Sequence, residues 1–392
     1  MMLPHQGWTD GKAGRALLAA LDAGDGTTRL VGGAVRDALL GLPVKDIDLA
    51  TRLSPETVID RLRAAGLKAV PTGLAHGTIT AVAQGLVAEV TTLRRDVATD
   101  GRHATVAFTD DWRQDAGRRD FTINALYATL PGGEISDFFG GFADLAARRV
   151  RFIGDPLQRI AEDHLRILRF FRFSARFAGV VDAEGLAACT ARANDLMALS
   201  RERVAGELRG LLGVADPGPI VALMLGHGIF TPIVPEIARL PVLARTVAAE
   251  VASATPGDWL RRLAALLPPD PDTADAVAAR LRLSNADKQR LRLAVVPLGS
   301  DDLHAAAWRD GAMAVIDRLL IAGEGGDAVT MLRDWQRPRL PVGGRDLLAR
   351  GLAPGPAVAA RLAHFEQLWV AAGFPNDAAT VTALLDRAVA AA

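Results

Sequence analysis

The segment Leu30–Thr51 (LVGGAVRDALLGLPVKDIDLAT) most constrains the fold, because it places two chemical devices on one short strand–helix–strand unit. A Gly-Gly pair, Gly32-Gly33, follows an apolar run typical of a strand, and Ala34–Leu40 reads as a short helix. Two glycines let a backbone approach a phosphate closely, since no Cβ stands in the way. Arg36 lies near the start of this helix, where a guanidinium can reach a phosphate.

The second device is the aspartate pair Asp46 and Asp48. Residues i and i+2 of a strand point to the same face, so both carboxylates would look the same way. Two hard oxygen ligands on one strand suit Mg²⁺, which takes one or two carboxylates together with substrate phosphates. Taken singly, a Gly-Gly pair is usually a turn and Asp-x-Asp is often a solvated strand edge. Together and in this order, they favour metal-assisted nucleotidyl transfer.

The order GG-x-x-RD followed by D-x-D resembles the signature of the class II tRNA nucleotidyltransferases and bacterial poly(A) polymerases. The resemblance implies an α/β, palm-like nucleotidyltransferase head with a mixed sheet, followed by an all-α C-terminal region of neck, body and tail. The expected limits are 1–150 for the head, 151–240 for a helical neck that binds nucleotide or RNA, and 241–392 for a tRNA-binding body and tail. Asp46 and Asp48 would be catalytic and hold Mg²⁺, while Gly33 and Arg36 would contact the triphosphate.

Two further segments of the first 150 residues carry candidate site residues. The string RRDFTINAL, which begins at Arg118, matches the family, and Arg119 takes the position of an arginine that contacts the triphosphate. Asp120 and Asn124 are expected to pin the local backbone. Glu89, near the start of a β-branched strand, is a candidate third carboxylate, and a solvent-facing strand glutamate is an equally good interpretation.

The segment Gly154–Phe173 is the most discriminating one. Asp155 as N-cap and Pro156 at the first helical position predict a single helix whose apolar stripe is Leu168, Phe171, Ala175 and Ala178. The opposite face carries Asp163, Arg166 and Arg169, with Arg172 at its edge. By spacing alone, an ion-paired solvated face explains these charges equally well.

The family resemblance gives that face a function. The Glu-Asp-x-x-Arg motif acts in class II enzymes as a protein template, which implies that Asp163 and Arg166 hydrogen-bond the Watson–Crick edge of the incoming base. An acceptor carboxylate beside a donor guanidinium can satisfy cytosine or adenine, whereas guanine and uracil would leave polar groups unpaired. Arg169 and Arg172 match family arginines that contact the nucleotide or its phosphates.

The remaining pattern predicts organisation. Strand-like runs are Thr28–Val31, Asp46–Ala50, Gly77–Ala83, Val87–Thr92 and Thr105–Phe108, with turns at Pro71–Gly73 and Pro131–Gly133 and a flexible loop at Asp96–Arg102. From Asp155 the pattern is helical, with breaks at Asp216–Pro219, Ala254–Gly257, Leu267–Pro271 and Leu352–Pro356. Ten of the 13 phenylalanines fall between Phe108 and Phe177, which predicts a tight join between the α/β part and the first helices after it.

Composition excludes several classes of protein. The 392 residues are 50% hydrophobic with a formal net charge of +0, so two or more cores are possible and no basic excess reveals a nucleic-acid binder. A single cysteine, Cys189, excludes an intrachain disulfide and a Cys-rich zinc site. The sequence shows no secretory h-region and no membrane span, which predicts a cytoplasmic protein. Some members of the family that the chain resembles carry a phosphohydrolase domain built on adjacent His-Asp; this chain has no His-Asp dipeptide, so we expect no such activity.

We therefore expect Mg²⁺-dependent, template-independent addition of C and A to the 3′ end of tRNA from CTP and ATP, with release of pyrophosphate and no obligate protein partner. The segment Pro71–Thr78 resembles that of CCA-adding members. The alternatives are a poly(A) polymerase, an enzyme that adds only CC or only A, and a non-catalytic RNA-binding relative. The last would be expected to lack a metal aspartate, and both are present.

Overall fold

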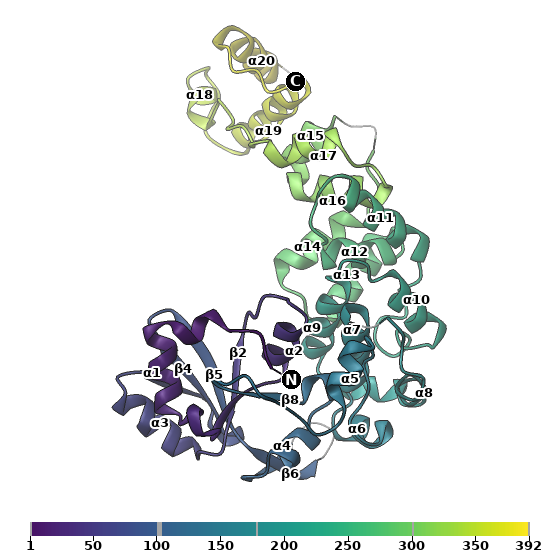
Figure 1. Cartoon of the computed structure of the whole chain (residues 1–392). Helices are drawn as coiled ribbons and strands as arrows, with labels where there is room; N and C mark the ends of the chain where they lie inside the picture. The colour runs from purple at the N-terminus through teal and green to yellow at the C-terminus, as the bar shows by residue number, and fades with distance from the viewer. Residues whose placement is uncertain (1, 100–103, 178, 300–301, 391–392) are drawn as a thin grey trace. The chain divides into compact units, whose positions relative to one another are not determined.

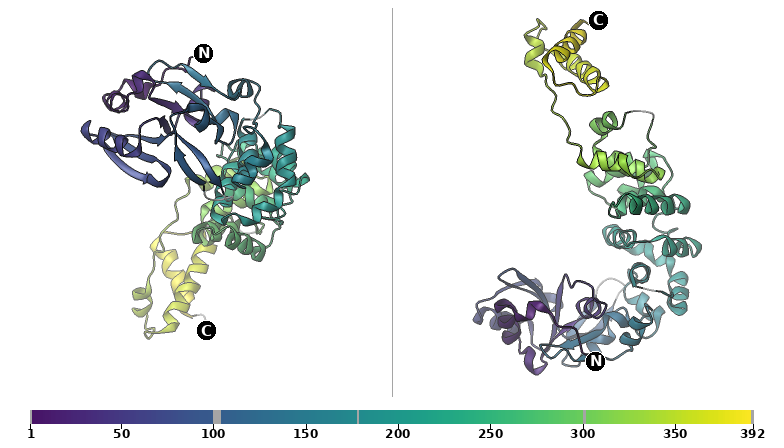
Figure 2. Two further views of the ribbon diagram at one scale, coloured as in Figure 1. Left: turned by 90° about the horizontal axis from the view of Figure 1, so that it is seen from below. Right: turned by 45° about the horizontal axis from the view of Figure 1, so that its top comes forward.

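The computed structural model describes residues 2–99, 104–177, 179–299 and 302–390 (Figure 1). The chain divides into two compact units, Met1–Ile233 and Val234–Ala392. The first unit contains all the described strands, and the second is built from helices (Figure 2). None of the described helices has the length and apolar character needed to cross a membrane. The three-part division at residues 150 and 240 stays a prediction.

A seven-stranded mixed sheet forms the centre of the first unit. Its strands are β1 (Thr28–Val31), β2 (Ile47–Thr51), β3 (Lys68–Gly73), β4 (Thr78–Ala83), β5 (Leu86–Thr92), β8 (Leu126–Thr129) and β9 (Ile135–Asp137), in the order β3-β4-β5-β2-β1-β8-β9. Strands β2 and β5 are parallel, and the other neighbours are antiparallel. This confirms the predicted mixed-sheet head and all five predicted strands. Four of them belong to this sheet, and the fifth is β7 (Ala104–Phe108) of the second, smaller sheet.

Two local predictions from the sequence were wrong. Residues Arg94–Thr99 form β6, which pairs with β7 (Ala104–Phe108), so the part of the predicted loop from Asp96 to Thr99 is strand, while 100–102 lie outside the described residues. The predicted turn Pro71–Gly73 lies within β3, whose register shifts between Val70 and Gly73. Proline is tolerated there because β3 is an edge strand and one side of it needs no hydrogen-bond donor.

Helices surround this sheet and continue after it. The first unit contains α1 (Lys12–Ala20), α2 (Gly33–Leu39), α3 (Pro55–Ala64), α4 (Trp112–Gly117), α5 (Gly141–Ala146), α6 (Pro156–Glu162), α7 (Arg166–Phe177), α8 (Ala183–Ala191), α9 (Arg201–Leu212) and α10 (Gly218–Gly226). Asp155 caps α6 by accepting a hydrogen bond from the amide of Leu157, and Pro156 begins the helix, as predicted.

The single helix predicted over this segment is instead two helices. Asp163 has extended backbone angles (φ −152°, ψ 105°) and ends α6, and α7 begins at Arg166. The Asp163 carboxylate accepts a hydrogen bond from the amide of Leu165 at 3.1 Å, so the side chain competes with the helical ladder. Of the predicted stripe, Leu168 and Phe171 are buried and Ala175 is half-buried, whereas Ala178 lies outside the described residues.

Phenylalanines join the sheet region to α7. Phe152 stacks on Phe170 with ring centroids 5.5 Å apart, and Phe121 lies 4.9 Å from Phe152 and 5.4 Å from Phe173. Phe121, Phe152 and Phe170 are fully buried. The tight join predicted from the phenylalanine distribution is therefore confirmed, and it fixes α7 against the head.

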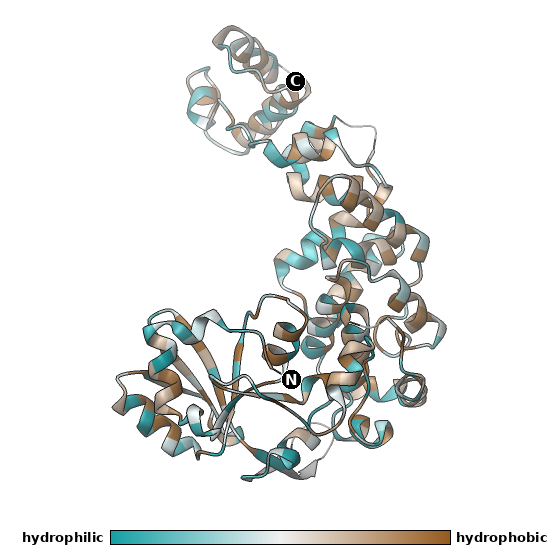
Figure 3. Ribbon diagram, viewed as in Figure 1, coloured by the Kyte–Doolittle hydropathy of each residue, from teal (hydrophilic) through white to brown (hydrophobic). Residues whose placement is uncertain are grey.

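The second unit consists of α11 (Leu240–Ala252), α12 (Trp259–Leu266), α13 (Pro271–Arg280), α14 (Asn285–Ala294), α15 (Leu303–Asp310), α16 (Ala312–Ala322), α17 (Asp327–Asp334), α18 (Gly344–Leu348), α19 (Pro356–Ala371) and α20 (Ala378–Ala390). The predicted break Ala254–Gly257 falls between α11 and α12, and each of the other three includes the first one or two residues of a helix, namely of α10, α13 and α19. Gly343 is the N-cap of α18. Hydrophobic and hydrophilic residues alternate on the same helices, as amphipathic packing requires (Figure 3).

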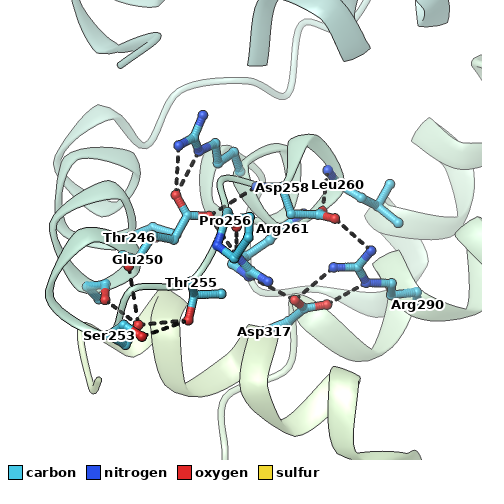
Figure 4. A network of polar contacts seen from close by, with 12 residues as sticks. Thr246, Glu250, Ser253, Thr255, Pro256, Asp258, Leu260, Arg261, Arg290 and Asp317 are labelled. Carbon is cyan, nitrogen blue, oxygen red and sulfur yellow. Dashed lines mark hydrogen bonds and ion pairs between the residues drawn. The ribbon is translucent and has the colours of Figure 1, made fainter. Parts of the chain in front are cut away.

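A buried ionic network holds the middle of the second unit together (Figure 4). Asp317, which is fully buried, accepts hydrogen bonds from Arg261 Nε at 2.9 Å and from Arg290 Nε at 2.7 Å. Arg261 also donates to Glu250 at 2.7 Å, so α11, α12, α14 and α16 share one set of charges. Every charge in this network has a partner of opposite sign, which makes the network structural.

Candidate active site

One cavity of about 720 Å³ in the first unit brings together all nine residues predicted to form the site. Glu89 lines it as well. The residues are Gly33, Arg36, Asp46, Asp48, Glu89, Arg119, Asp163, Arg166, Arg169 and Arg172. They come from α2, from β2 and the residue before it, Asp46, from β5, from the segment after α4, and from the α6–α7 region. The cavity therefore has carboxylates on the sheet and arginines on the helices and loops around it.

The acidic side of the cavity is formed by the parallel strands β2 and β5. Asp48 is the register partner of Glu89, so their side chains lie on the same face of the sheet. Burial, together with the nearby Glu89 and Asp46 carboxylates, raises the pKa of Asp48 above its ordinary value despite the opposing charges of Arg119 and Arg36. Among the described residues, neither Asp46 nor Asp48 accepts a side-chain hydrogen bond or forms an ion pair.

Two carboxylates that form no ion pair with a described arginine or lysine fit a divalent metal ion. The described residues contain no group of three or more His, Cys, Asp or Glu close enough together to enclose one. An open pair of this kind suits Mg²⁺, which keeps positions for substrate phosphates and water.

The glycine turn between β1 and α2 needs glycine for two reasons. Gly32 has φ +66° and ψ −125°, backbone angles that L side chains rarely adopt. A Cβ at this position would also lie 3.2 Å from Nη1 of Arg119. The amide of Gly32 donates to the carbonyl of Leu126 on β8 at 3.0 Å, which fixes the turn beside the cavity.

Arg36 is buried behind this turn and is held on several sides. Its Nη1 donates to Asn124 Oδ1 at 2.5 Å, and its Nε donates to Asp37 Oδ1 at 2.8 Å. The guanidinium carbon lies 4.4 Å from the ring centroid of Phe177. Burial lowers the pKa of Arg36, and the neighbouring Asp37 opposes that change.

Asp120 and Asn124 link Arg36 to α7. Asp120 Oδ1 accepts from the amide of Phe121 at 2.8 Å and from Asn124 Nδ2 at 3.0 Å. Its other oxygen accepts from Arg169 Nε at 2.7 Å. Asp120 thus pins the backbone, as expected, and also fixes an arginine of the cavity.

The side chains of Asp163 and Arg166, predicted to read the base, do not pair with each other, although the amide of Arg166 donates to the carbonyl of Asp163 at 3.0 Å. Arg203 Nη2 donates to both carboxylate oxygens of Asp163, at 3.0 and 2.8 Å. Arg166 donates to Glu162 Oε2 at 2.7 Å and, through Nη2, to the carbonyl of Arg118 at 3.0 Å. Each side chain is therefore held by partners within the protein, and both line the cavity.

Sequence reasoning missed residues of two kinds. Arg94, Arg118 and Arg176 also line the cavity. Of these, Arg176 has a sequence signal, because it follows Arg172 by four residues on one helix face. The second kind lies behind the cavity: Arg203 and Glu207 of α9 pair with Asp163 and Arg172, and nothing in their local sequence indicates those partners.

The fold and the acid–arginine cavity define a nucleotidyltransferase, and residues 28–151 match the Poly A polymerase head domain. The protein belongs to the family of CCA-adding tRNA nucleotidyltransferases. It is 35% identical over 367 residues to CCA tRNA nucleotidyltransferase 1, mitochondrial, of Mus musculus, which covers 88% of this chain and 83% of that protein. It is 30% identical over 391 residues to the CCA-adding enzyme of Levilactobacillus brevis, covering 95% and 97%.

Solved structures agree with this membership. The Bacillus stearothermophilus CCA-adding enzyme in complex with CTP superposes with a TM-score of 0.77 at 25% identity, over 96% of this chain and 98% of that one. The fold is also that of the Thermotoga maritima CCA-adding enzyme complexed with tRNA, with a TM-score of 0.65 at 20% identity, over 97% and 96%.

Proposed function

We propose that this protein adds C and A nucleotides to the 3′ end of tRNA, using CTP and ATP without a nucleic-acid template and releasing pyrophosphate. The observation that carries the proposal is the convergence, in one cavity, of an open aspartate pair with the Asp163–Arg166 pair. The first can support nucleotidyl transfer, and the second can choose a base. Family membership over most of the chain supports the same activity.

Asp46 and Asp48 are the residues that would hold Mg²⁺. The unpartnered carboxylates and the raised pKa of Asp48, caused first by burial and then by Glu89, support this assignment. When bound, the metal ion supplies positive charge at the α-phosphate and at the pyrophosphate leaving group. Glu89 is placed to add a third negative charge beside the pair.

The cationic side of the cavity binds and orients the triphosphate. Gly33 allows close approach of the backbone, and Arg36 and Arg119 supply guanidinium groups that are already fixed in place. Prearranged donors neutralise the charge that develops on pyrophosphate without reorganising during the reaction. With the triphosphate held in this way, the 3′-hydroxyl oxygen of the tRNA attacks the α-phosphorus. The bond between the α-phosphorus and the oxygen that bridges to the β-phosphate breaks, and pyrophosphate leaves.

Asp163 and Arg166 would select the base. Cytosine and adenine each offer an amino donor beside a ring-nitrogen acceptor, which an aspartate next to an arginine can satisfy. Arg203 and Glu162 restrain the two side chains, so the pattern of donors and acceptors is fixed before a base enters. Arg169 and Arg172 of α7 would contact the nucleotide or its phosphates.

Incorporation of labelled CTP or ATP into defined tRNA ends tests the proposal. The substrates are tRNA that lacks CCA, tRNA that ends in C and tRNA that ends in CC. We expect CTP to extend the first two and ATP to extend only the third. Addition of only C or only A would identify a partial enzyme, and long A tracts on unrelated RNA ends would identify a poly(A) polymerase. No incorporation by the wild-type protein would contradict the proposal.

A cytoplasmic location stays a prediction from the sequence.

A further inference from the structure

Asp115 and Tyr127 form a buried hydrogen-bonded pair behind the cavity, and the proposed function gives this pair no role. Asp115 is 1% exposed and Tyr127 is 0% exposed, and neither lines the cavity. The Tyr127 hydroxyl donates to Asp115 Oδ2 at 2.6 Å. A short bond to a carboxylate in a buried environment is strong and directional, so the two groups form one rigid unit.

This unit holds Arg119 along two of its three nitrogens. Arg119 Nε donates to the hydroxyl oxygen of Tyr127 at 3.2 Å, and Nη2 donates to Asp115 Oδ2 at 3.2 Å. The third nitrogen, Nη1, lies beside the glycine turn, where a Cβ on Gly32 would be 3.2 Å away. One edge of the guanidinium is therefore anchored in the protein, and the other faces the turn that begins α2.

Asp115 also organises two other parts of the cavity wall. Its Oδ1 accepts from Arg118 Nε at 2.9 Å and from the backbone amide of Arg94 at 3.2 Å. One buried carboxylate thus connects three residues that line the cavity, Arg94, Arg118 and Arg119, and its removal would release all of them.

The ionisation states of the pair favour this arrangement. Burial would raise the pKa of Asp115, but Arg119 and Arg118 outweigh it and hold the pKa at about 2, so the carboxylate stays charged. Burial raises the pKa of Tyr127 well above its ordinary value, so the hydroxyl keeps its proton and continues to donate to Asp115. The hydroxyl can then accept from Arg119 and donate to Asp115 at the same time.

We propose that Tyr127 and Asp115 are positioning residues for triphosphate binding, which act by holding the guanidinium of Arg119 toward the Gly32-Gly33 turn. The proposal rests on the proposed function in assigning Arg119 to the triphosphate. The triphosphate is common to CTP and ATP, so this pair affects both nucleotides equally and leaves the choice between them unchanged.

The test uses the full-length protein with the variant Tyr127→Phe, which keeps the ring and removes only the hydroxyl. We expect the KM for CTP and the KM for ATP to rise together by about tenfold, with a smaller change in kcat and none in the KM for tRNA. A variant Thr28→Val is the matched control, because Thr28 is a buried hydroxyl in the same sheet that bonds Leu21 and Thr51 and does not line the cavity. If both variants are folded and Tyr127→Phe has the same KM for CTP and for ATP as Thr28→Val, the proposal is overturned.

A double-variant cycle shows whether Tyr127 acts through Arg119. If it does, Arg119→Lys combined with Tyr127→Phe binds nucleotide no more weakly than Arg119→Lys alone. If the two substitutions instead weaken nucleotide binding independently, so that their fold-changes multiply in the double variant, the proposal is overturned. Asp115→Asn is the second variant, because it weakens the other half of the pair. It is expected to raise both KM values at least as much as Tyr127→Phe.

A binding measurement separates failure of this proposal from failure of the proposed function. Tyr127 is the only tyrosine of the chain, so 3-fluorotyrosine places a single ¹⁹F probe beside Arg119. We expect inorganic tripolyphosphate to shift this resonance, and the Arg119→Lys variant to lose the shift. A wild-type protein that shifts but does not extend tRNA would contradict the proposed function only. If the labelled protein without substitutions extends tRNA but tripolyphosphate does not shift its ¹⁹F resonance, only the positioning proposal is contradicted.

Discussion

Asp48 and Glu89 are register partners on the parallel strands β2 and β5, and their carboxylates face the same cavity. The pKa of Asp48 is raised, with burial as the largest cause and Glu89 as the next. A protein that gathers negative charge without a partner of its own sacrifices stability at that point. The arrangement is explained if a cation and a polyanionic substrate complete it.

Asp46→Ala is expected to abolish incorporation of both CTP and ATP while the fold persists. The carboxylate is exposed and forms no side-chain hydrogen bond or ion pair with the described residues, so the free energy of unfolding should change by less than about 0.5 kcal/mol. Primer extension with each nucleotide, together with urea unfolding, checks this. Asp60→Ala, at an exposed position of α3, is the control. Substantial residual turnover by Asp46→Ala would contradict the metal assignment.

Replacing Asp163 and Arg166 by alanine, singly and together, is expected to alter nucleotide choice more than triphosphate binding. Discrimination of CTP and ATP against UTP and GTP should fall by roughly tenfold or more, because the pattern of donors and acceptors is lost. Single-turnover incorporation with each nucleotide measures it. Arg192→Ala, which removes an ion pair with Asp195 away from the cavity, is the control. Unchanged preference for CTP and ATP would count against base selection by this pair.

Gly32→Ala is expected to weaken nucleotide binding and to destabilise the protein by about 1–3 kcal/mol, since the backbone at φ +66° is strained for alanine. The added methyl group would also press on Nη1 of Arg119. Gly41→Ala separates these causes, because Gly41 has φ +68° and open space at the Cβ position. We expect both variants to lose stability and only Gly32→Ala to raise the KM for CTP and ATP. Equal KM values for the two variants would show that Arg119 is not disturbed.

Asp115 is expected to make stability depend on acid pH. Its folded pKa of about 2 lies below the ordinary value of 3.8, so the charged carboxylate stabilises the fold above pH 3.8 and loses this effect as the pH falls toward 2. The full contribution is roughly 2 kcal/mol, of which about half is lost by pH 3. Urea unfolding of the wild type and Asp115→Asn from pH 6 to pH 3 tests the sign. The difference in unfolding free energy between them should shrink on acidification, and a constant or growing difference would refute the prediction.

Asp317→Ala is expected to destabilise the second unit by about 3 kcal/mol, because it leaves the buried Arg261 and the half-buried Arg290 without their shared carboxylate. Asp272→Ala is the matched control. The Asp272 side chain is 91% exposed, and its ion pair with Arg292 is long, with 3.7 Å between Oδ1 and Nη1. Guanidinium unfolding followed by circular dichroism compares the two. A loss below about 1 kcal/mol for Asp317→Ala would mean that the network relaxes or admits water.

The sequence predicted the chemical groups of the site well, because these groups lie in short segments with strong local constraints. The Gly32-Gly33 turn, the i, i+2 aspartates and the arginine string that contains Arg119 can each be recognised within about ten residues of sequence. All of them meet in one cavity. Their individual functions stay proposals until the variants are measured.

The helix break at Asp163 was missed for a physical reason. Apolar periodicity continues through Pro156–Phe177 and predicts one helix, whereas the carboxylate of Asp163 caps a local turn and is bound by Arg203, 40 residues away. A similar long-range pairing, between Arg172 and Glu207, fixes a second residue of the cavity. Periodicity describes which face of a segment is apolar and contains no information about such partners.

The sequence by itself determined the class of chemistry, because residue type and spacing along a strand or turn set which groups can bind a metal ion or a phosphate. Only the tertiary structure decided how those groups are oriented. Tyr127 reaches Arg119 across eight residues and Asp120 reaches Arg169 across 49. Those contacts depend on how the sheet, α4 and α7 pack, and packing is a property of the whole folded unit.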